Sequence, residues 1–463
     1  MTVVDRAALP DGRERARARR LALVGGSIGN LVEWYDWFVY SSFALYFASS
    51  FFPKGDQTAQ LINTAAVFAV GFLMRPVGGW ILGRMADRAG RKSALTLTVT
   101  LMSVAALLIA IAPTYQQAGY TGALVLLLAR LIQGLSLGGE YAASATYLTE
   151  VSDRRRRGFG SSFQYVSMTM GQLLGLAILI LMQLTLTDAE LRSWGWRVPF
   201  VIGALLALVV FWLRRRLAET SAFTETEEQP AAGKSGEADT RGTLRALWEH
   251  RRQAALVIAL TLGGTVAYYT YTTYLLKYLI NTAGLPPFTA NLVNFCSLAV
   301  FAVLQPLAGA LSDRIGRRPL LITFALGTSI ATYPLMTSLG SAKSFWPAFW
   351  LSLTALVIIT GYTSINACVK AELFPTRVRA LGVALPYALA NAVFGGTAEL
   401  VALTFKDAGR ESYFFWYVTG CALVSLITYL FMRDTRNVAL SRSEEIEAAG
   451  AAQPAQPGRS TST

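Results

Sequence analysis

Long apolar stretches alternate with short polar ones along almost the whole chain. Each apolar stretch has roughly 20 residues, the length that crosses about 30 Å of hydrocarbon as an α-helix. About twelve such stretches can be distinguished. They begin near Leu21, Gln60, Ser93, Thr121, Phe159 and Arg197, and then near Gln253, Thr289, Pro319, Phe345, Ala380 and Ser412. Because strands with open edges cannot lie in lipid, the pattern predicts an all-α membrane protein.

One polar loop occurs twice. Gly83–Lys92 reads Gly-Arg-Met-Ala-Asp-Arg-Ala-Gly-Arg-Lys, and Gly309–Arg318 reads Gly-Ala-Leu-Ser-Asp-Arg-Ile-Gly-Arg-Arg. Each copy lies between two apolar stretches. A second signal also repeats, since Glu150 and Glu372 both precede a group of arginines at the end of an apolar stretch. Repetition at half the chain length indicates an internally duplicated membrane protein with two halves of six helices.

The polar segments divide the chain into five parts. We expect an N-terminal tail at 1–20, a first half at 21–216, a linker at 217–252, a second half at 253–433 and a C-terminal tail at 434–463. The linker is charged and contains glycine, which favours a mobile segment. The C-terminal tail is rich in Ala, Gln, Pro and Ser, which predicts disorder.

Composition and charge support a membrane location. The chain has 463 residues, of which 53% are hydrophobic and only 15% charged, against about 25% charged in soluble proteins. Its net charge of +13 does not indicate nucleic-acid binding, because the basic residues gather in alternate loops. That alternation follows the positive-inside rule and puts both termini in the cytoplasm. The first apolar stretch is too long, and too acidic at Glu33 and Asp36, for a cleavable signal.

Few residues are available for metal binding or enzyme chemistry. The three cysteines, Cys296, Cys368 and Cys421, lie in apolar stretches without metal-ligand spacing, and the single histidine, His250, lies in the linker. We therefore predict no metal, no cofactor and no enzymatic activity, and any proton chemistry in the membrane must use carboxylates.

Three stretches resemble one transporter family. Gly29–Asp36, Phe72–Gly79 and Arg130–Glu140, together with the repeated loops, are similar to the metabolite:proton symporter family of the major facilitator superfamily. The resemblance implies twelve transmembrane helices in two pseudo-symmetric halves. It also implies a monomer in a bacterial inner membrane that imports small carboxylates or zwitterions with protons by alternating access.

Three further stretches concern the identity of the transported substrate. Thr272–Tyr278, Lys370–Pro375 and Tyr387–Gly396 resemble family members that carry 2-oxoglutarate. Citrate, another dicarboxylate, shikimate or a zwitterionic osmolyte are the alternatives within transport, and a nutrient receptor with a transporter fold is the alternative from another class. Two intramembrane arginines favour an acid over a zwitterion, because guanidinium binds carboxylates in pairs of hydrogen bonds.

The first apolar stretch carries two acids on one helix face, Glu33 and Asp36. Counting along the helices puts Asp36 about 22 Å above the inner surface and Arg130 about 13 Å below the outer one. We therefore expect Asp36 and Arg130 to pair. By resemblance to sugar-carrying relatives, this pair couples proton to substrate, because burial and a neighbouring guanidinium act oppositely on an aspartate. The alternatives are a purely structural ion pair and, for Glu33, either a second proton carrier or a helix contact.

Arg75 and Glu140 are a further possible pair inside the membrane. Such a pair ties two helices together if it is structural. Alternatively, Arg75 binds a carboxylate of the substrate. We expect Arg75 and Arg130 together to attract the acid.

The seventh stretch has an unusually polar run from Tyr268 to Tyr274. Its hydroxyls suit a keto acid, the preceding Gly263-Gly264 could break the helix, and an interfacial aromatic belt is the alternative. Lys277 is expected to extend to the head groups, and the alternative is that it draws anions toward the outer mouth. The predicted substrate contacts are Arg75, Arg130, Gln133, Gln172, Tyr268, Thr272, Tyr274 and Asn391.

The repeated loops predict a cytoplasmic gate. An Asp at a helix end among arginines can stabilise an exposed helix N-terminus and bridge to the basic residues, which holds the inner side closed in one state. The alternative is that these charges only set topology and end helices. The predicted gate residues are Asp87, Arg91, Glu150 and Arg157 in the first half and Asp313, Arg317, Glu372 and Arg379 in the second.

Overall fold

The computed structural model describes residues 12–53, 55–89, 91–152, 154–217, 248–374 and 379–436. Only the backbone is described at 12–27, 83–89, 91–96, 139–148, 150–151, 154, 213–217 and 379–380. Most of the predicted linker and C-terminal tail, and residues 1–11 of the predicted N-terminal tail, lie outside the described residues.

The N-terminal half consists of long helices joined by short ones. The long helices are α1 (Gly12–Phe51), α2 (Gln57–Ala89), α3 (Arg91–Ile111), α5 (Thr121–Val151), α6 (Arg157–Thr185) and α8 (Val198–Leu217). The short ones are α4 (Tyr115–Ala118), η1 (Arg154–Arg156), α7 (Asp188–Ser193) and η2 (Gly195–Arg197). The first helix thus begins at Gly12, inside the segment expected as a tail.

The C-terminal half repeats this plan with more interruptions. Its helices are α11 (Arg251–Tyr269), η3 (Thr270–Tyr274), α12 (Leu275–Asn281), α13 (Pro287–Ile315), α14 (Arg317–Gly340), α15 (Phe345–Thr363), α16 (Asn366–Glu372), α17 (Arg379–Ala390), η4 (Asn391–Gly395), α18 (Ala398–Asp407) and α19 (Glu411–Phe431). Here η3 and η4 are single π-helical turns that leave their passes continuous. Such turns are frequent at functional sites.

The hydropathy of these helices agrees with a membrane protein. Ten helical segments of the described chain are long and apolar enough to cross a membrane, and Leu97–Ile111 is a shorter apolar helix. With α1, they make up the twelve-helix, all-α arrangement that the sequence predicts. Large apolar side chains such as Leu73, Leu184 and Ile330 are exposed on the outside of the bundle, where lipid would cover them.

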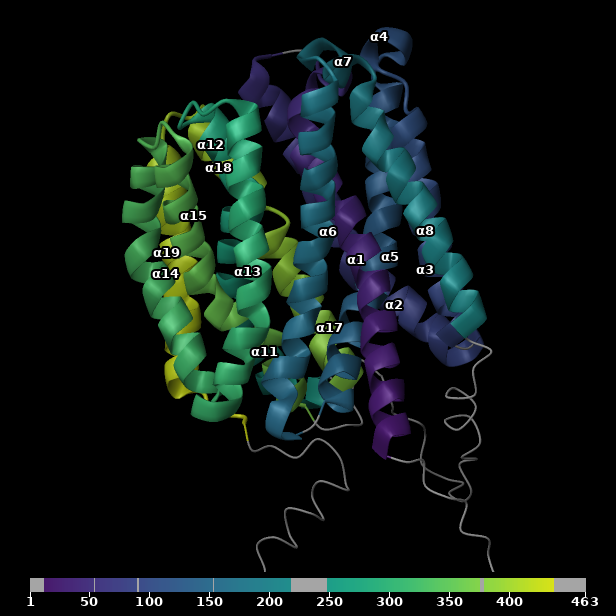
Figure 1. Ribbon diagram of the computed structural model, residues 1–463, viewed down its shortest axis with the longest axis vertical. Helices are drawn as coiled ribbons and strands as arrows, with labels where there is room; N and C mark the ends of the chain where they lie inside the picture. The colour runs from purple at the N-terminus through teal and green to yellow at the C-terminus, as the bar shows by residue number, and fades with distance from the viewer. Residues whose placement is uncertain are drawn as a thin grey trace, which may run out of the picture.

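The two halves stand side by side, and the colours of Figure 1 separate them into a purple-to-teal and a green-to-yellow group. At the boundary, α13 packs along α6, α17 packs on α5, and α18 packs on α2. We call the end of the bundle that carries α4 and α7 the outer end, and the end that carries the repeated loops the inner end (Figure 1).

The family-like stretches at 72–79 and 130–140 form a tight helix pair. α2 and α5 approach so closely that a Cβ atom on Gly138 would lie 2.0 Å from the carbonyl oxygen of Arg75. On Gly134 it would lie 1.9 Å from the carbonyl oxygen of Gly71. These glycines therefore serve helix packing, and they fix the positions of Arg75 and Arg130 relative to each other.

Candidate functional site

Asp36 is buried on α1 and is held by Gln133 of α5. Gln133 Nε2 donates a hydrogen bond to Asp36 Oδ2 over 2.9 Å. The other carboxylate oxygen, Oδ1, has no hydrogen-bond partner and faces α8, where a Cβ atom on Gly203 would lie 2.2 Å from it. A larger residue at Gly203 would therefore displace the acid.

Asp36 and Arg130 interact electrostatically, but no hydrogen bond joins them directly. Nε, Nη1 and Nη2 of Arg130 have no hydrogen-bond partner, and its guanidinium carbon lies 3.5 Å from the ring centre of Tyr40 instead. Gln133, one helical turn further along α5, takes the place next to Asp36. Both charged groups are nevertheless buried inside the N-terminal half, not turned toward lipid.

Arg75 occupies an aromatic environment next to that of Arg130. Its guanidinium carbon lies 3.9 Å from the ring centre of Phe72 and 4.3 Å from that of Trp37. The same Trp37 ring lies 5.2 Å from the guanidinium carbon of Arg130. Nε and Nη2 of Arg75 have no hydrogen-bond partner. Two cations thus share one aromatic ring, an arrangement that cation–π attraction stabilises only in part.

Glu33 and Asp36 share one face of α1, as predicted. Both line a small cavity between α1, α3 and α8, within the N-terminal half. Its lining residues are Gly29, Val32, Glu33, Asp36, Val99, Met102, Gly203, Ala207 and Val210. The two acids therefore lie behind the arginines as seen from the C-terminal half. The side chain of Glu140, the other acid considered for Arg75, lies outside the described residues.

The polar run of the seventh stretch meets the N-terminal half at several points. Gln172 Nε2 donates to the carbonyl oxygen of Thr272 over 2.6 Å. The Tyr268 ring packs against Tyr165 at 5.3 Å between ring centres, and Tyr269 packs against Phe72 at the same distance. The hydroxyls of Tyr268 and Tyr269 are buried without hydrogen-bond partners. Tyr268, Thr272 and Gln172 are thus brought together at the boundary between the halves.

Two predicted contacts have other partners. Tyr274 donates to Glu411 Oε1 over 2.6 Å and packs edge-on against Phe414, so it faces α19. Asn391, in η4, accepts a hydrogen bond from Thr265 and donates to the Tyr387 hydroxyl over 3.2 Å. Tyr387 in turn interacts electrostatically with Arg75, which connects Asn391 to the arginines through one tyrosine.

Gly263 and Gly264 do not break the seventh helix. α11 continues through both, and each allows a close approach: a Cβ atom on Gly264 would lie 2.3 Å from the Tyr362 ring. The irregular part is instead the π-helical turn Thr270–Tyr274. Such turns are frequent at functional sites, and this one contains Thr272 and Tyr274, two of the predicted substrate contacts.

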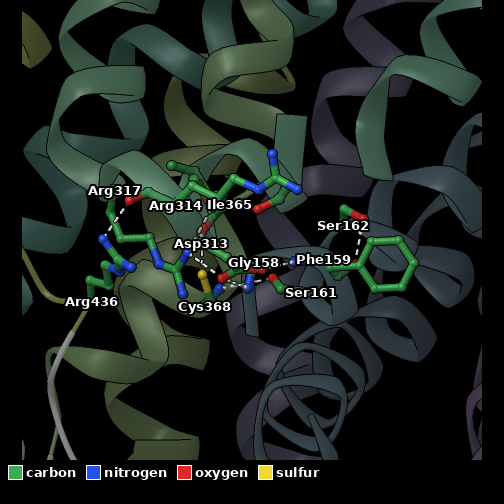
Figure 2. A network of polar contacts seen from close by, with 12 residues as sticks. Gly158, Phe159, Ser161, Ser162, Asp313, Arg314, Arg317, Ile365, Cys368 and Arg436 are labelled. Atoms are coloured by element: carbon green, nitrogen blue, oxygen red, sulfur yellow. Dashed lines mark hydrogen bonds and ion pairs between the residues drawn. The ribbon is translucent and has the colours of Figure 1, made fainter. Parts of the chain in front are cut away.

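The second copy of the repeated loop connects the two halves at the inner end (Figure 2). Asp313 accepts hydrogen bonds from the backbone N–H groups of Gly158 and Phe159 over 2.8 and 2.9 Å, at the N-terminus of α6. Arg317 Nη1 lies 2.7 Å from Asp313 Oδ1, and its Nη2 lies 3.7 Å from Glu372 Oε1. An acid at a helix N-terminus with a bridging arginine agrees with the arrangement predicted for the gate.

The other predicted gate residues are only partly described. Arg157 is buried at the start of α6. The side chains of Asp87, Arg91, Glu150 and Arg379 lie outside the described residues. The contacts of the gate are therefore seen for the second copy of the loop.

Lys277 does not extend to the head groups, contrary to expectation. Its side chain is 2% exposed and forms an ion pair with Glu399 of α18. Lys277 Nζ also donates to Ser41 Oγ of α1 over 3.1 Å. Sequence reasoning missed Glu399 altogether. The available signal was an acid within an apolar stretch, which is costly without a partner.

The chain belongs to the Major Facilitator Superfamily, whose model matches residues 26–385 and 273–457. This superfamily is one of transporters, and the chain is therefore a multi-pass membrane transporter and not an enzyme.

The chain is also similar to individual transporters over most of its length. The chain is 50% identical to the alpha-ketoglutarate permease of Escherichia coli, over 90% of this chain and 94% of the relative. It is 32% identical to the citrate-proton symporter of Klebsiella pneumoniae, over 90% and 93%. It is 31% identical to the shikimate transporter of Escherichia coli, over 91% and 96%. Among solved structures, the proton:xylose symporter XylE has a TM-score of 0.73 at 20% identity, over 94% of this chain and 99% of that one; this likeness concerns the fold.

Proposed function

We propose that the chain imports 2-oxoglutarate together with protons, by alternating access of a site between its two halves. The observation that carries this proposal is the pair of buried arginines at Arg75 and Arg130. Both have guanidinium nitrogens without hydrogen-bond partners, and both lie against the Trp37 ring. Arg75 interacts electrostatically with Glu33, and Arg130 with Asp36, but among the described side chains no carboxylate forms a hydrogen bond with either guanidinium. A buried charge with unsatisfied donors is costly, and a carboxylate between the two guanidinium groups would reduce that cost.

The nature of the relatives supports the same cargo. The permease at 50% identity is one for alpha-ketoglutarate, another name for 2-oxoglutarate. Relatives for citrate and shikimate are near 30% identical. All three cargoes are acids, which is what two arginines in an aromatic pocket select. Citrate, another dicarboxylate and shikimate remain the alternatives, and a transporter-fold receptor is the alternative from another class.

Proton coupling follows from the charge of the cargo. A dianion that enters a negative-inside cell is opposed by about 2.3 kcal/mol per charge per 100 mV. Two protons that move with it cancel that opposition. We assign one proton to Asp36, with Glu33 as a second candidate, because both line the cavity behind the arginines. Gln133 connects Asp36 to the helix of Arg130, so that a change at either charged group can reach the other.

The gate and the location complete the proposal. Asp313, Arg317 and Glu372, with Arg157 and the first-copy residues, act as a cytoplasmic latch that opens when cargo is released. Both termini lie in the cytoplasm of a bacterium, and the transporter works in the inner membrane as a monomer. Gln172, Tyr268 and Thr272 line the substrate site, whereas Asn391 acts through Tyr387.

Uptake by proteoliposomes tests this function. The purified chain is reconstituted, a pH gradient is imposed, and accumulation of labelled 2-oxoglutarate, citrate, shikimate and glycine betaine is compared. We expect 2-oxoglutarate to accumulate more than the other three compounds. Accumulation should occur only when the outside is more acidic than the inside, and protons should enter together with the substrate. Uptake that does not depend on the pH gradient, or a preference for glycine betaine over 2-oxoglutarate, would refute the proposal. Binding without any uptake would favour the receptor.

A further inference from the structure

Three residues at the outer end form a buried polar cluster, which we call the outer triad: Ser41, Lys277 and Glu399. Lys277 Nζ forms an ion pair with Glu399 Oε1, and the two side chains are 2% and 4% exposed. Ser41 Oγ donates to Glu399 Oε2 over 2.9 Å and accepts from Lys277 Nζ over 3.1 Å. Both oxygens of the glutamate are therefore satisfied.

The triad is divided unequally between the halves. Ser41 belongs to α1 of the N-terminal half, whereas Lys277 and Glu399 belong to α12 and α18 of the C-terminal half. When the halves separate at the outer end, the two hydrogen bonds of Ser41 must break. The ion pair between Lys277 and Glu399 can stay intact, and it then becomes exposed to water. Opening thus converts a buried ion pair into one that ions in the outer solution can reach.

The surroundings of Glu399 contain few other charges. The hydroxyls of Tyr40 on α1 and Tyr274 on η3 both interact electrostatically with it. The elements packed on α18 are α2, α19, η3 and α11. Among the described side chains of these elements, the acids and bases are Arg75 on α2, Glu411 on α19, which is bound to Tyr274 and Thr282, and Arg251 and Arg252 at the inner end of α11. Lys277 is therefore the cation that neutralises Glu399.

The triad also adjoins the arginine site. The Tyr40 ring lies 3.5 Å from the guanidinium carbon of Arg130, and Tyr40 interacts electrostatically with Arg130 and with Glu399. A single tyrosine thus lies between the outer triad and the proposed substrate site. An anion entering from the outer end would meet Lys277 before Arg130.

We propose that the outer triad is a second site for cargo, at which Glu399 takes up a proton and Lys277 then binds one carboxylate of the acid. This inference rests on the proposed function for the nature of the cargo. In the step, a proton from the outer solution adds to Oε1 of Glu399. Lys277 remains an ammonium group and exchanges the glutamate for the carboxylate of the cargo.

Charge balance is the reason for the proton. The closed triad holds one positive and one negative charge. If a cargo carboxylate joined it while Glu399 stayed ionised, a net negative charge would be buried when the gate closed, at a cost of several kcal/mol. Protonation of Glu399 keeps the site neutral with the cargo bound. The outer end would therefore close with a cargo carboxylate bound at the triad only when Glu399 has also taken up a proton. This requirement couples the movement of the cargo to that of the proton.

The test is the proton-to-substrate ratio of the full chain in proteoliposomes, measured with labelled 2-oxoglutarate and an internal pH dye. Glu399→Gln mimics the protonated acid and should lower the ratio by one proton, while exchange of internal for external 2-oxoglutarate persists. Glu411→Gln is the matched control, because Glu411 is an acid of the same half that binds hydroxyls and not Lys277. It should keep the wild-type ratio.

Lys277→Met should raise the apparent KM for 2-oxoglutarate by about tenfold or more, the effect of losing one ion-paired hydrogen bond. An unchanged ratio in Glu399→Gln would overturn the inference. If that variant does not fold, the neutral double variant Lys277→Met/Glu399→Gln replaces it, and a wild-type ratio there overturns the inference equally. A wild-type chain that moves no carboxylate refutes the proposed function itself, whereas normal wild-type symport with an unaffected Glu399→Gln refutes only the outer site.

Discussion

Asp313 of α13 reaches across the boundary between the halves and accepts a hydrogen bond from the backbone N–H of Gly158 over 2.8 Å. Gly158 lies at the N-terminus of α6, where unpaired N–H groups and the helix dipole favour a negative charge. The carboxylate thus stabilises a helix of the opposite half. If the inner end opens as proposed, this contact must break, so it would stabilise the closed conformation of the transporter.

Replacing Asp313 by Asn should open the inner end. The amide has no charge and one acceptor oxygen, so one of its two backbone hydrogen bonds and the pairing with Arg317 are lost. Hydrogen bonds to charged groups contribute about 1.5–3 kcal/mol, which corresponds to roughly a tenfold or larger shift between states. Cys368 is a natural reporter, because it is buried and its backbone N–H donates to Ser161 across the boundary.

The measurement is the rate of maleimide labelling of Cys368, after Cys296→Ser and Cys421→Ser. Asp313→Asn should speed labelling by about tenfold, in line with the shift above. Asp434→Asn is the matched control. Asp434 also accepts backbone hydrogen bonds at this end, from Arg318 and Arg436, but these do not cross the boundary between the halves. If Cys368 is labelled at the same rate in Asp313→Asn and Asp434→Asn, the result would contradict the proposed role of Asp313 as a latch.

Gly158→Ala should prevent complete closure of the inner end for a steric reason. A Cβ atom there would lie 2.2 Å from Ser312 Oγ and 2.5 Å from the carbonyl oxygen of Gly309. Overpacking of this kind costs about 1–3 kcal/mol, and it acts only in the closed state. We expect faster labelling of Cys368 and slower uptake. Gly420→Ala, with nothing within 4 Å of its Cβ position, should behave as wild type in both assays.

The sequence predicted the parts of this molecule that depend on local pattern. The length of the apolar stretches predicted the membrane passes, and the repeated loop predicted the two halves. The same loop pointed to Asp313, whose role as a latch is a proposal. Asp313 could be recognised because an acid among arginines at a helix end has few other uses. The shared face of Glu33 and Asp36 followed from their spacing alone.

Contacts between distant helices could not be predicted in the same way. Glu399 and Lys277 are far apart in sequence, and only the packing of α18 near α12 makes them partners. Tyr274 was proposed as a substrate contact because it belongs to a run of hydroxyl side chains, and a run of this kind does not show which helix each hydroxyl faces; in the structure Tyr274 binds Glu411 of α19. For Asp36, depth counting found the correct level but could not distinguish Arg130 from Gln133, one turn apart on the same helix.

Arg75→Lys and Arg130→Lys should each weaken substrate binding. Lysine keeps the charge but cannot offer two parallel N–H donors to a carboxylate or stack as a plane on Trp37. Loss of one such contact should raise the apparent KM for 2-oxoglutarate by about tenfold or more. Arg192→Lys is the control, since Arg192 forms an exposed ion pair with Asp188. Uptake kinetics that are equal in all three variants would exclude the arginines from the substrate site.

Asp36→Asn separates proton coupling from substrate binding. The amide retains an oxygen that can accept the hydrogen bond of Gln133, and it has nearly the same volume, so the packing against Gly203 is preserved. It cannot exchange a proton, however. Because one of the proposed protons is lost, we expect the proton-to-substrate ratio to fall by one. Accumulation driven by a pH gradient should then drop below that of wild type, while exchange of internal for external 2-oxoglutarate continues.

Asp188→Asn is the control for this variant, because that aspartate is exposed and pairs with Arg192 at the outer end. It should accumulate substrate as wild type does. The two assays on Asp36→Asn distinguish the possible roles of the acid. Loss of both accumulation and exchange would make Asp36 a structural group, whereas full accumulation would show that the proton travels through another carboxylate, for which Glu33, three residues earlier on the same face of α1, is the first to replace.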